Sequence, residues 1–170
     1  VSLIFHGIKQ LNASLTMGNY FFKDIKEEGI VLYDSEKFKL AQPKKLTPEQ
    51  YRQKAQDHFD QWFENGNNAL TKFEFSFQKG ILNEAAFDLH QATERYYTTI
   101  LLVFTDYRPK DHNLETLGIK VDMCDPRFAV FPKTTDEQKH RFELLKRAYI
   151  DARYKMDEYQ ITKGELTYLA

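Results

Sequence analysis

The sequence predicts a mainly α fold, an antiparallel up-and-down helical bundle with a small N-terminal α/β remnant. After about residue 42, apolar side chains recur at three- and four-residue spacing over three long segments, which is the period of an amphipathic helix. Modest loops join these segments, and short loops are typical of antiparallel neighbours. The 170 residues are 42% hydrophobic and 29% charged, which indicates a globular chain with a sizeable core.

The first part of the chain, 1–41, has a different character. Short apolar runs at 1–5 and 30–33 predict strands, because β-branched and aromatic residues favour extended structure. Helical spacing between these runs predicts one helix over 8–17 and a second over 21–28. This piece is too small for its own core, so we expect the tail of an α/β domain or an arm packed on the rest. The chain starts with Val, which we expect to be a cut point inside a longer protein or a trimmed end.

A linker over 40–46 leads into the first long helix. The Thr-Pro-Glu-Gln run at 47–50 is a start signal, with Thr as the cap, Pro at the first helical position and Gln closing a capping box. The Gly-Asn-Asn run at 66–68 can bend this helix, but we expect the helix to continue to about residue 78.

The remaining segments predict further helices and loops. Phe128 and Phe131 lie in one of these loops and are expected to plug the core. In chain order we expect a helix over 82–106, a loop over 107–113, a short helix over 114–124, a loop over 126–133, a helix from a Thr-Thr-Asp-Glu start signal to about 155, and a final short helix over 162–169.

Composition excludes several classes of protein. Lys plus Arg number 24 and Asp plus Glu 25, so a net charge of −1 excludes nucleic-acid binding through bulk positive charge, but not a local basic face. A single cysteine allows no intrachain disulfide and no Cys-rich zinc site. No apolar run reaches the roughly 18 residues that a membrane span needs. We therefore expect a cytoplasmic protein with no membrane contact.

Familiar catalytic motifs are also missing from the sequence. It contains no Gly-rich phosphate loop, no Gly-x-Ser-x-Gly, no His-Glu-x-x-His and no Asp-x-Asp pair. We expect no metal and no cofactor.

Polar residues on the helix over 82–106 form the first candidate site. His90 and Glu94 lie one turn apart, as do Gln91 and Arg95, so each pair shares a helix face. The His90–Glu94 pair fits either two metal ligands or an exposed face with local pairs, and the spacing favours the exposed face.

Two further candidate sites contain cations. Arg108, Lys110 and His112 precede the short helix, whose N-terminal N–H groups would add to a phosphate site; an ordinary capped loop fits the same residues. Arg153 lies near the inner edge of the last long helix. A partly buried Arg needs a partner, either a carboxylate such as Glu94 or the phosphate of a ligand.

Three segments in order resemble the HEPN domain over about 47–170. Ala85–Tyr96 is similar to the central helix of that family, with an Ala-rich start followed by Gln-x-x-Glu. Pro109–Leu117 resembles its Pro-x-x-His-x-Leu-x-x-Leu loop and short helix, and Ala148–Tyr154 its closing Tyr-x-x-x-Arg-Tyr helix.

HEPN domains often follow a minimal nucleotidyltransferase domain in one chain. The resemblance therefore implies two parts, with 1–41 as the tail of a nucleotidyltransferase-like α/β domain and 42–170 as the HEPN bundle. The Gly-Ser turn and the Asp-x-Asp carboxylates of such a domain are not in the sequence, so we expect no nucleotide transfer by this chain alone.

The resemblance implies an accessory module, often a homodimer, that recognises a nucleotide or RNA for a nucleotidyltransferase domain in the same longer chain. On this hypothesis Arg95 and Arg153 contact phosphate, and Lys110 and His112 meet it at the start of the short helix. Gln91 and Glu94 would orient these groups.

Two alternatives stay open. One is a metal-independent HEPN ribonuclease of the toxin type, with His112 as general base and Arg108 or Arg153 stabilising the transition state. Its family pattern has four to six residues between Arg and His, and the Arg108-x-x-x-His112 spacing is one residue short. The other alternative is a structural dimerisation module whose polar pairs are salt bridges. Convergence of Arg153, His112 and the helix over 82–106 on one cleft would distinguish the first two hypotheses from the third.

Overall fold

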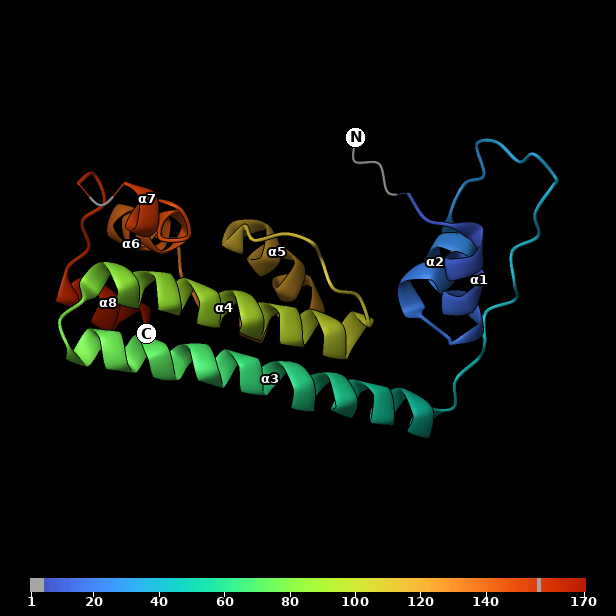
Figure 1. Cartoon of the computed structure of the whole chain (residues 1–170), viewed down its shortest axis with the longest axis horizontal. Coiled ribbons are helices and arrows are strands. Elements are labelled where there is room, and N and C mark those ends of the chain that lie inside the picture. The colour runs from blue at the N-terminus through green and yellow to red at the C-terminus, as the bar shows by residue number, and fades with distance from the viewer. Residues whose placement is uncertain (1–4, 156) are drawn as a thin grey trace.

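A computed structural model describes residues 5–155 and 157–170, and in these residues all regular structure is helical (Figure 1). A long antiparallel pair, α3 (Pro48–Gln78) and α4 (Leu82–Thr105), forms the body, and three shorter helices, α5, α6 and α7, cover the side of α4 away from α3. The bundle predicted from the sequence is confirmed. The elements are α1 (Ile8–Thr16), α2 (Tyr20–Glu28), α3 (Pro48–Gln78), α4 (Leu82–Thr105), α5 (Leu114–Cys124), the 3₁₀ helix η1 (Pro126–Phe128), α6 (Asp136–Arg147), α7 (Asp151–Tyr154) and α8 (Lys163–Leu169).

Local signals in the sequence fix the ends of these helices. Thr47 caps α3 in a capping box with Gln50, and Thr135 caps α6 in the same way with Gln138. The turn between α3 and α4 contains Gly80 at φ +73°, a left-handed conformation that glycine adopts without strain. With the Asn113 cap of α5 and the Thr162 capping box of α8, these signals explain why the boundaries of α3, α4, α5 and α8 match those expected from the sequence.

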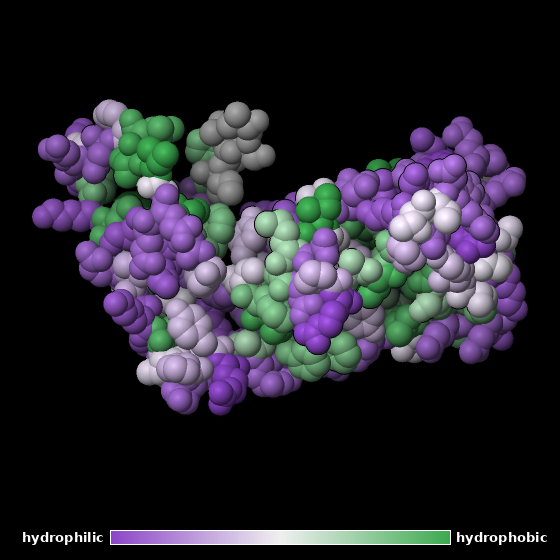
Figure 2. All heavy atoms as spheres, turned by 180° about the vertical axis from the view of Figure 1, so that it is seen from behind, coloured by the Kyte–Doolittle hydropathy of each residue, from purple (hydrophilic) through white to green (hydrophobic). Residues whose placement is uncertain are grey.

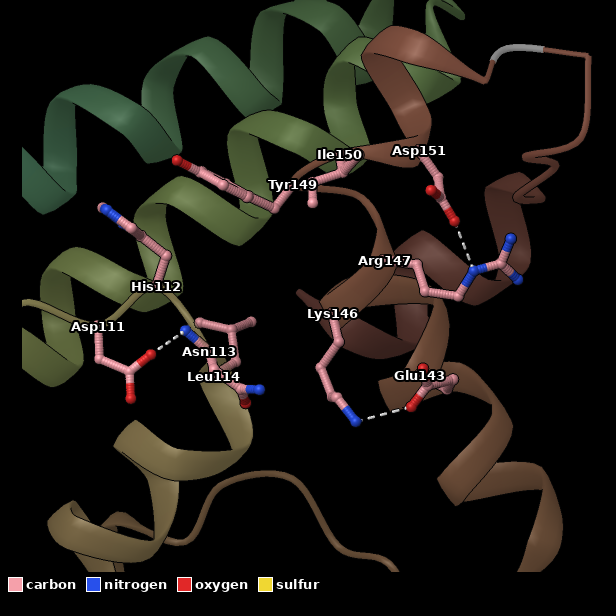
Figure 3. A pocket seen from close by; sticks show the side chains of 10 residues that line it. All are labelled: Asp111, His112, Asn113, Leu114, Glu143, Lys146, Arg147, Tyr149, Ile150 and Asp151. Atoms are coloured by element: carbon pink, nitrogen blue, oxygen red, sulfur yellow. Dashed lines mark hydrogen bonds and ion pairs between the residues drawn. The ribbon is translucent and has the colours of Figure 1, made fainter. Parts of the chain in front are cut away.

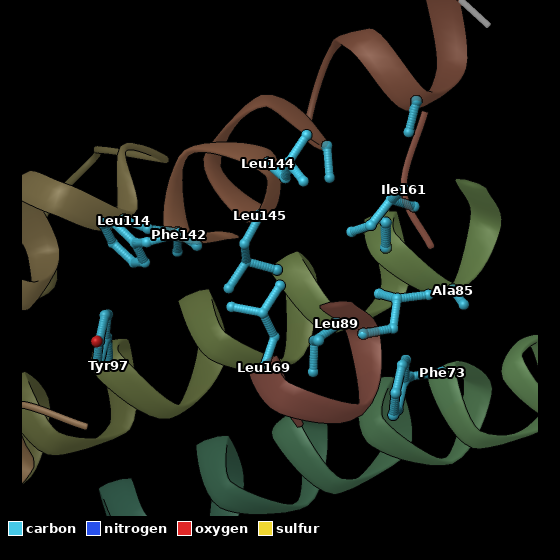
Figure 4. Close-up of a cluster of buried hydrophobic side chains, with 14 of the residues drawn as sticks. Phe73, Ala85, Leu89, Tyr97, Leu114, Phe142, Leu144, Leu145, Ile161 and Leu169 are labelled. Atoms are coloured by element: carbon cyan, nitrogen blue, oxygen red, sulfur yellow. The ribbon is translucent and has the colours of Figure 1, made fainter. Parts of the chain in front are cut away.

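The core lies where α4 meets the other helices (Figure 4). Leu114 and Leu117 of α5 and Leu145 of α6 are fully buried against it, and Phe128 and Phe131 pack on its edge as expected. Burying one large aliphatic side chain contributes about 1.5–3 kcal/mol, so these contacts hold the shorter helices on α4. Viewed from behind, apolar side chains also form patches over the middle of the surface (Figure 2).

The α/β remnant expected at the N-terminus is wrong in one part. Residues 30–33 form no strand, and their side chains are 75–94% exposed. A strand needs a neighbour to pair its backbone, and the described residues offer none here. The strand expected over 1–5 falls almost wholly outside the described residues, and Phe5 has no regular structure. The two expected helices are present as α1 and α2.

The helix expected to run to about residue 155 is broken in two. The α6 helix ends at Arg147, and a turn over 148–150 precedes α7. Ile150 N–H donates to the Arg147 carbonyl, three residues back. This 3₁₀-type bond replaces the α-helical pattern, in which the partner lies four residues back. The freed Tyr149 carbonyl instead accepts from the Arg153 guanidinium, at 3.0 Å from Nε.

Candidate functional site

A cleft of about 360 Å³ opens between the start of α5 and the turn that joins α6 to α7 (Figure 3). The loop before α5 forms one wall, and the last turn of α6 with residues 149–151 forms the other. The lining residues are Asp111, His112, Asn113, Leu114, Glu143, Lys146, Arg147, Tyr149, Ile150 and Asp151.

Three polar side chains connect this cleft to the interior of the bundle. Nδ1 of His112 lies 3.0 Å from Oε1 of Glu94, and Oε2 of Glu94 lies 3.9 Å from Nε2 of His90. Nδ1 of His90 donates to the Leu145 carbonyl at 2.9 Å, which ties α4 to α6. The His112 side chain is 58% exposed, Glu94 15% and His90 1%, so the connection runs from solvent to core.

Burial dominates the chemistry of His90. Desolvation lowers the pKa of its imidazole, and the Leu145 carbonyl and the Glu94 carboxylate oppose this only in part. His90 is therefore neutral at pH 7. Among the described residues, His90 Nε2 and Glu94 Oε2 are buried polar atoms without a hydrogen-bond partner. The prediction that His90 lies on an exposed face is wrong, because its side chain is buried in the core.

Tyr149 is the centre around which the site is assembled. Its ring stacks on His112 with centroids 5.2 Å apart and planes 10° apart, and His90 lies 5.2 Å away. The Arg153 guanidinium lies 5.0 Å from the same ring and 4.4 Å from the ring of Phe87. These cation–π contacts and the Tyr149 carbonyl are the partners that Arg153 finds. Glu94, proposed from the sequence as its partner, bonds His112 instead.

The cations inside the cleft have carboxylate partners. Lys146 Nζ lies 2.8 Å from Glu115 and 2.7 Å from Glu143, and Arg147 Nε lies 2.7 Å from Asp151. Partial burial of Lys146 disfavours its charge, but these hydrogen bonds outweigh burial and raise the pKa of the ammonium group.

The N-terminus of α5 is also occupied by the chain itself. The Asn113 side chain accepts from the backbone N–H groups of Glu115 and Thr116, and Asp111 accepts from Asn113 N–H. The capped loop that the sequence allowed as an alternative is thus present.

The structure brings together some of the residues singled out in the sequence and separates others. His112, Glu94 and Arg153 meet around Tyr149, and Gln91 is half-buried on the same helix as Glu94. Arg95 donates to the Asn65 carbonyl on α3, and Arg108 stacks on Trp62 at 4.3 Å. Lys110 is exposed in the loop.

The burial of His90 is what sequence reasoning missed. Ala86 and Thr93 lie four and three residues from it and are both buried, so the helical period had already placed this histidine on the inner face. The polar type of the side chain concealed that position.

A sequence model of the HEPN domain matches residues 59–169, which include every residue of the cleft. The chain belongs to the HEPN family. As a HEPN chain, it contains a module of the nucleotide- and RNA-related type. Among curated proteins, none matches the sequence.

Two further features are absent from the described part of this HEPN chain. No helix there is long and apolar enough to span a membrane. No group of three or more His, Cys, Asp or Glu side chains is arranged there to hold a metal ion.

Proposed function

We propose that this HEPN chain recognises a nucleotide or RNA as an accessory module of a nucleotidyltransferase domain in the same longer chain. The observation that carries the proposal is that His112 and Tyr149 stack on each other in the lining of one cleft, with Glu94 bonded to His112 and Arg153 packed on Tyr149 behind that lining. In a purely structural module, salt bridges alone would not require an exposed imidazole held in one orientation at the rim of a cleft.

Each proposed residue has a role that its position allows. His112 meets the ligand at the rim, Glu94 fixes the imidazole, and Arg153 supports the ring of Tyr149 from α7. Lys110, exposed two residues before His112, meets phosphate that extends beyond the cleft. Gln91 and Arg95 lie on α4, where Arg95 serves a ligand only after it leaves the Asn65 carbonyl.

The test is a titration of the chain with fluorescently labelled single-stranded RNA at 50 and 200 mM NaCl. We expect weak binding that falls along a shallow slope, of order −0.7 per phosphate contact in a log–log plot. The variant His112→Ala should lose most of this binding, whereas His140→Ala, an exposed histidine on α6, should retain it. Equal binding by the two variants, or none by the wild type, would refute the proposal.

The Glu94–His112 hydrogen bond also favours a second candidate, a metal-independent ribonuclease. A carboxylate that holds Nδ1 leaves Nε2 free to take a proton from a ribose 2′-hydroxyl. Arg108, however, is stacked on Trp62, and Arg153 on Phe87. We therefore expect no cleavage when the titrated RNA is run on a gel. A cleaved product that disappears in His112→Ala would promote the ribonuclease.

A homodimer belongs to the same proposal. Light scattering after gel filtration measures it directly, and a monomeric mass at 100 µM chain would contradict it.

A further inference from the structure

Carboxylates outnumber the cations Lys146 and Arg147 in and beside the cleft. Lys146 and Arg147 face Asp111, Glu143 and Asp151 along the lining, and Glu115 adds a fourth carboxylate beside Lys146. Both cations have a carboxylate oxygen within 2.8 Å, and Asn113 caps the N-terminus of α5. A phosphate group in this cleft would lie among carboxylates, and like charges repel.

The aromatic part of the cleft, in contrast, is suited to a ligand, because its rings are held in place and remain accessible. One face of the His112 ring lies on Tyr149, and Glu94 holds Nδ1, so the ring is fixed in orientation. Yet the side chain is 58% exposed, so more than half of it is accessible to a ligand. Nucleobases stack on aromatic side chains, including His, and a ring that is already fixed loses little entropy when a base lands on it.

We infer that the cleft binds the base and ribose of a nucleoside unit, and that the phosphates stay outside the cleft, where Lys110 is their one proposed contact. This inference rests on the proposed function and specifies its ligand chemistry as an unpaired nucleobase, from a free nucleotide or from RNA. Stacking on the His112 ring, which Tyr149 supports from behind, supplies the affinity, and the number of phosphates contributes little.

The experiment compares adenosine with ATP by isothermal titration calorimetry at 50 and 300 mM NaCl. The two dissociation constants should agree within about threefold, and neither should change appreciably with salt. His112→Ala should weaken both ligands about tenfold, the usual effect of removing a stacking partner. His112→Phe, which keeps a flat ring, should retain part of the binding. Six linked adenylates should bind no more than about sixfold tighter than adenosine, the statistical gain of six equivalent bases; a larger gain would assign the site to RNA backbone contacts.

A gain-of-function variant tests the role of the carboxylates. Glu115→Gln with Glu143→Gln frees Lys146, so ATP should bind several-fold tighter with an appreciable salt dependence, and adenosine should be unchanged. The control is Glu64→Gln with Glu74→Gln, two exposed α3 residues whose replacement changes net charge equally. Equal ATP gains in both variants would overturn the inference.

The outcomes separate this inference from the proposed function. If ATP binds more than about tenfold tighter than adenosine and loses affinity in salt, the inference fails and the proposed function stands. The same holds if single-stranded RNA binds but adenosine does not. If no nucleoside, nucleotide or RNA binds, both fail.

Discussion

At the scale of single residues, His90 shows how burial sets a protonation state. The folded chain holds the imidazole neutral because desolvation lowers its pKa, whereas an unfolded His has a pKa near 6.5. Between those two pKa values the unfolded chain binds the extra proton. Stability must therefore rise with pH, from the folded pKa up to about 6.5.

We predict that the pH dependence of stability due to His90 is lost in His90→Gln, whose amide can still donate to the Leu145 carbonyl. Between pH 7.5 and 5.5 the free energy of unfolding of the wild type should fall more than that of the variant, by at most about 1.4 kcal/mol per pH unit. Urea unfolding at several pH values measures the difference. Parallel pH profiles would mean that His90 is not held neutral.

Gly66 illustrates a residue whose role is space. A Cβ at this position would lie 2.5 Å from Cε1 of Tyr96, whose hydroxyl donates to the Asn67 side chain at 2.8 Å. Ala is the better helix former by about 1 kcal/mol, but the clash opposes it.

We therefore predict that Gly66→Ala destabilises the chain by about 1–2 kcal/mol. In a Tyr96→Ala background, where the ring is gone, the same substitution should stabilise by up to about 1 kcal/mol. Denaturant unfolding of the four chains forms a double-mutant cycle. Additive effects would show that the contact with Tyr96 is not the cause.

At the scale of elements, Phe21 of the N-terminal pair α1–α2 stacks on Tyr107, and a second attachment of this pair to the bundle is made by Asp106. This residue ends α4 in a left-handed conformation, φ 52°. Its carboxylate accepts from Lys54 and His58 of α3 and from Tyr20 N–H of α2, at 2.5, 2.7 and 3.2 Å. One side chain thus joins three helices.

Asp106→Ala should cost about 2–3 kcal/mol of stability, because the three donors lose their acceptor and Ala is strained at positive φ. Asp106→Asn should cost less, since Asn tolerates that conformation and keeps one acceptor oxygen. Limited proteolysis across 29–46 should accelerate more in the Ala variant than in the Asn variant. Equal rates in the wild type and both variants would contradict the attachment.

The segment 30–33, unlike Asp106, is expected to contribute little to stability. Because Ile30 and Leu32 are 87% and 94% exposed, Ile30→Ser with Leu32→Ser should change the free energy of unfolding by less than about 0.5 kcal/mol. Thermal unfolding of the double variant checks this. A larger loss of stability would show that these side chains are buried in solution.

At the scale of the whole molecule, short-range signals made most of the fold predictable. The helices were predictable from the capping boxes at Thr47 and Thr135 and from the three- and four-residue period of apolar side chains. Both signals depend only on neighbours in sequence. The failures depend on distant partners. A strand at 30–33 needs a sheet, and the break after Arg147 has neither Gly nor Pro within it.

The sequence singled out some of the residues that gather around Tyr149, but not their pairings. His112, Glu94 and Arg153 were identified from spacing and resemblance, yet the sequence could not show that Glu94 bonds His112 rather than Arg153. That choice follows from the tertiary contact of the loop over 107–113 with α4. Tyr149 joins them only because the turn at 148–150 aims its ring at the loop.

The proposed function requires nucleotides or RNA to bind at the His112 cleft. The chain has five histidines, and NMR of their ring carbons during titration with single-stranded RNA at pH 7.5 observes each one separately. We predict that the His112 signal shifts most and that His90 follows through Glu94, whereas His6, His58 and His140 stay in place. Shifts confined to His6, His58 or His140, with His112 unmoved at saturating RNA, would contradict the account.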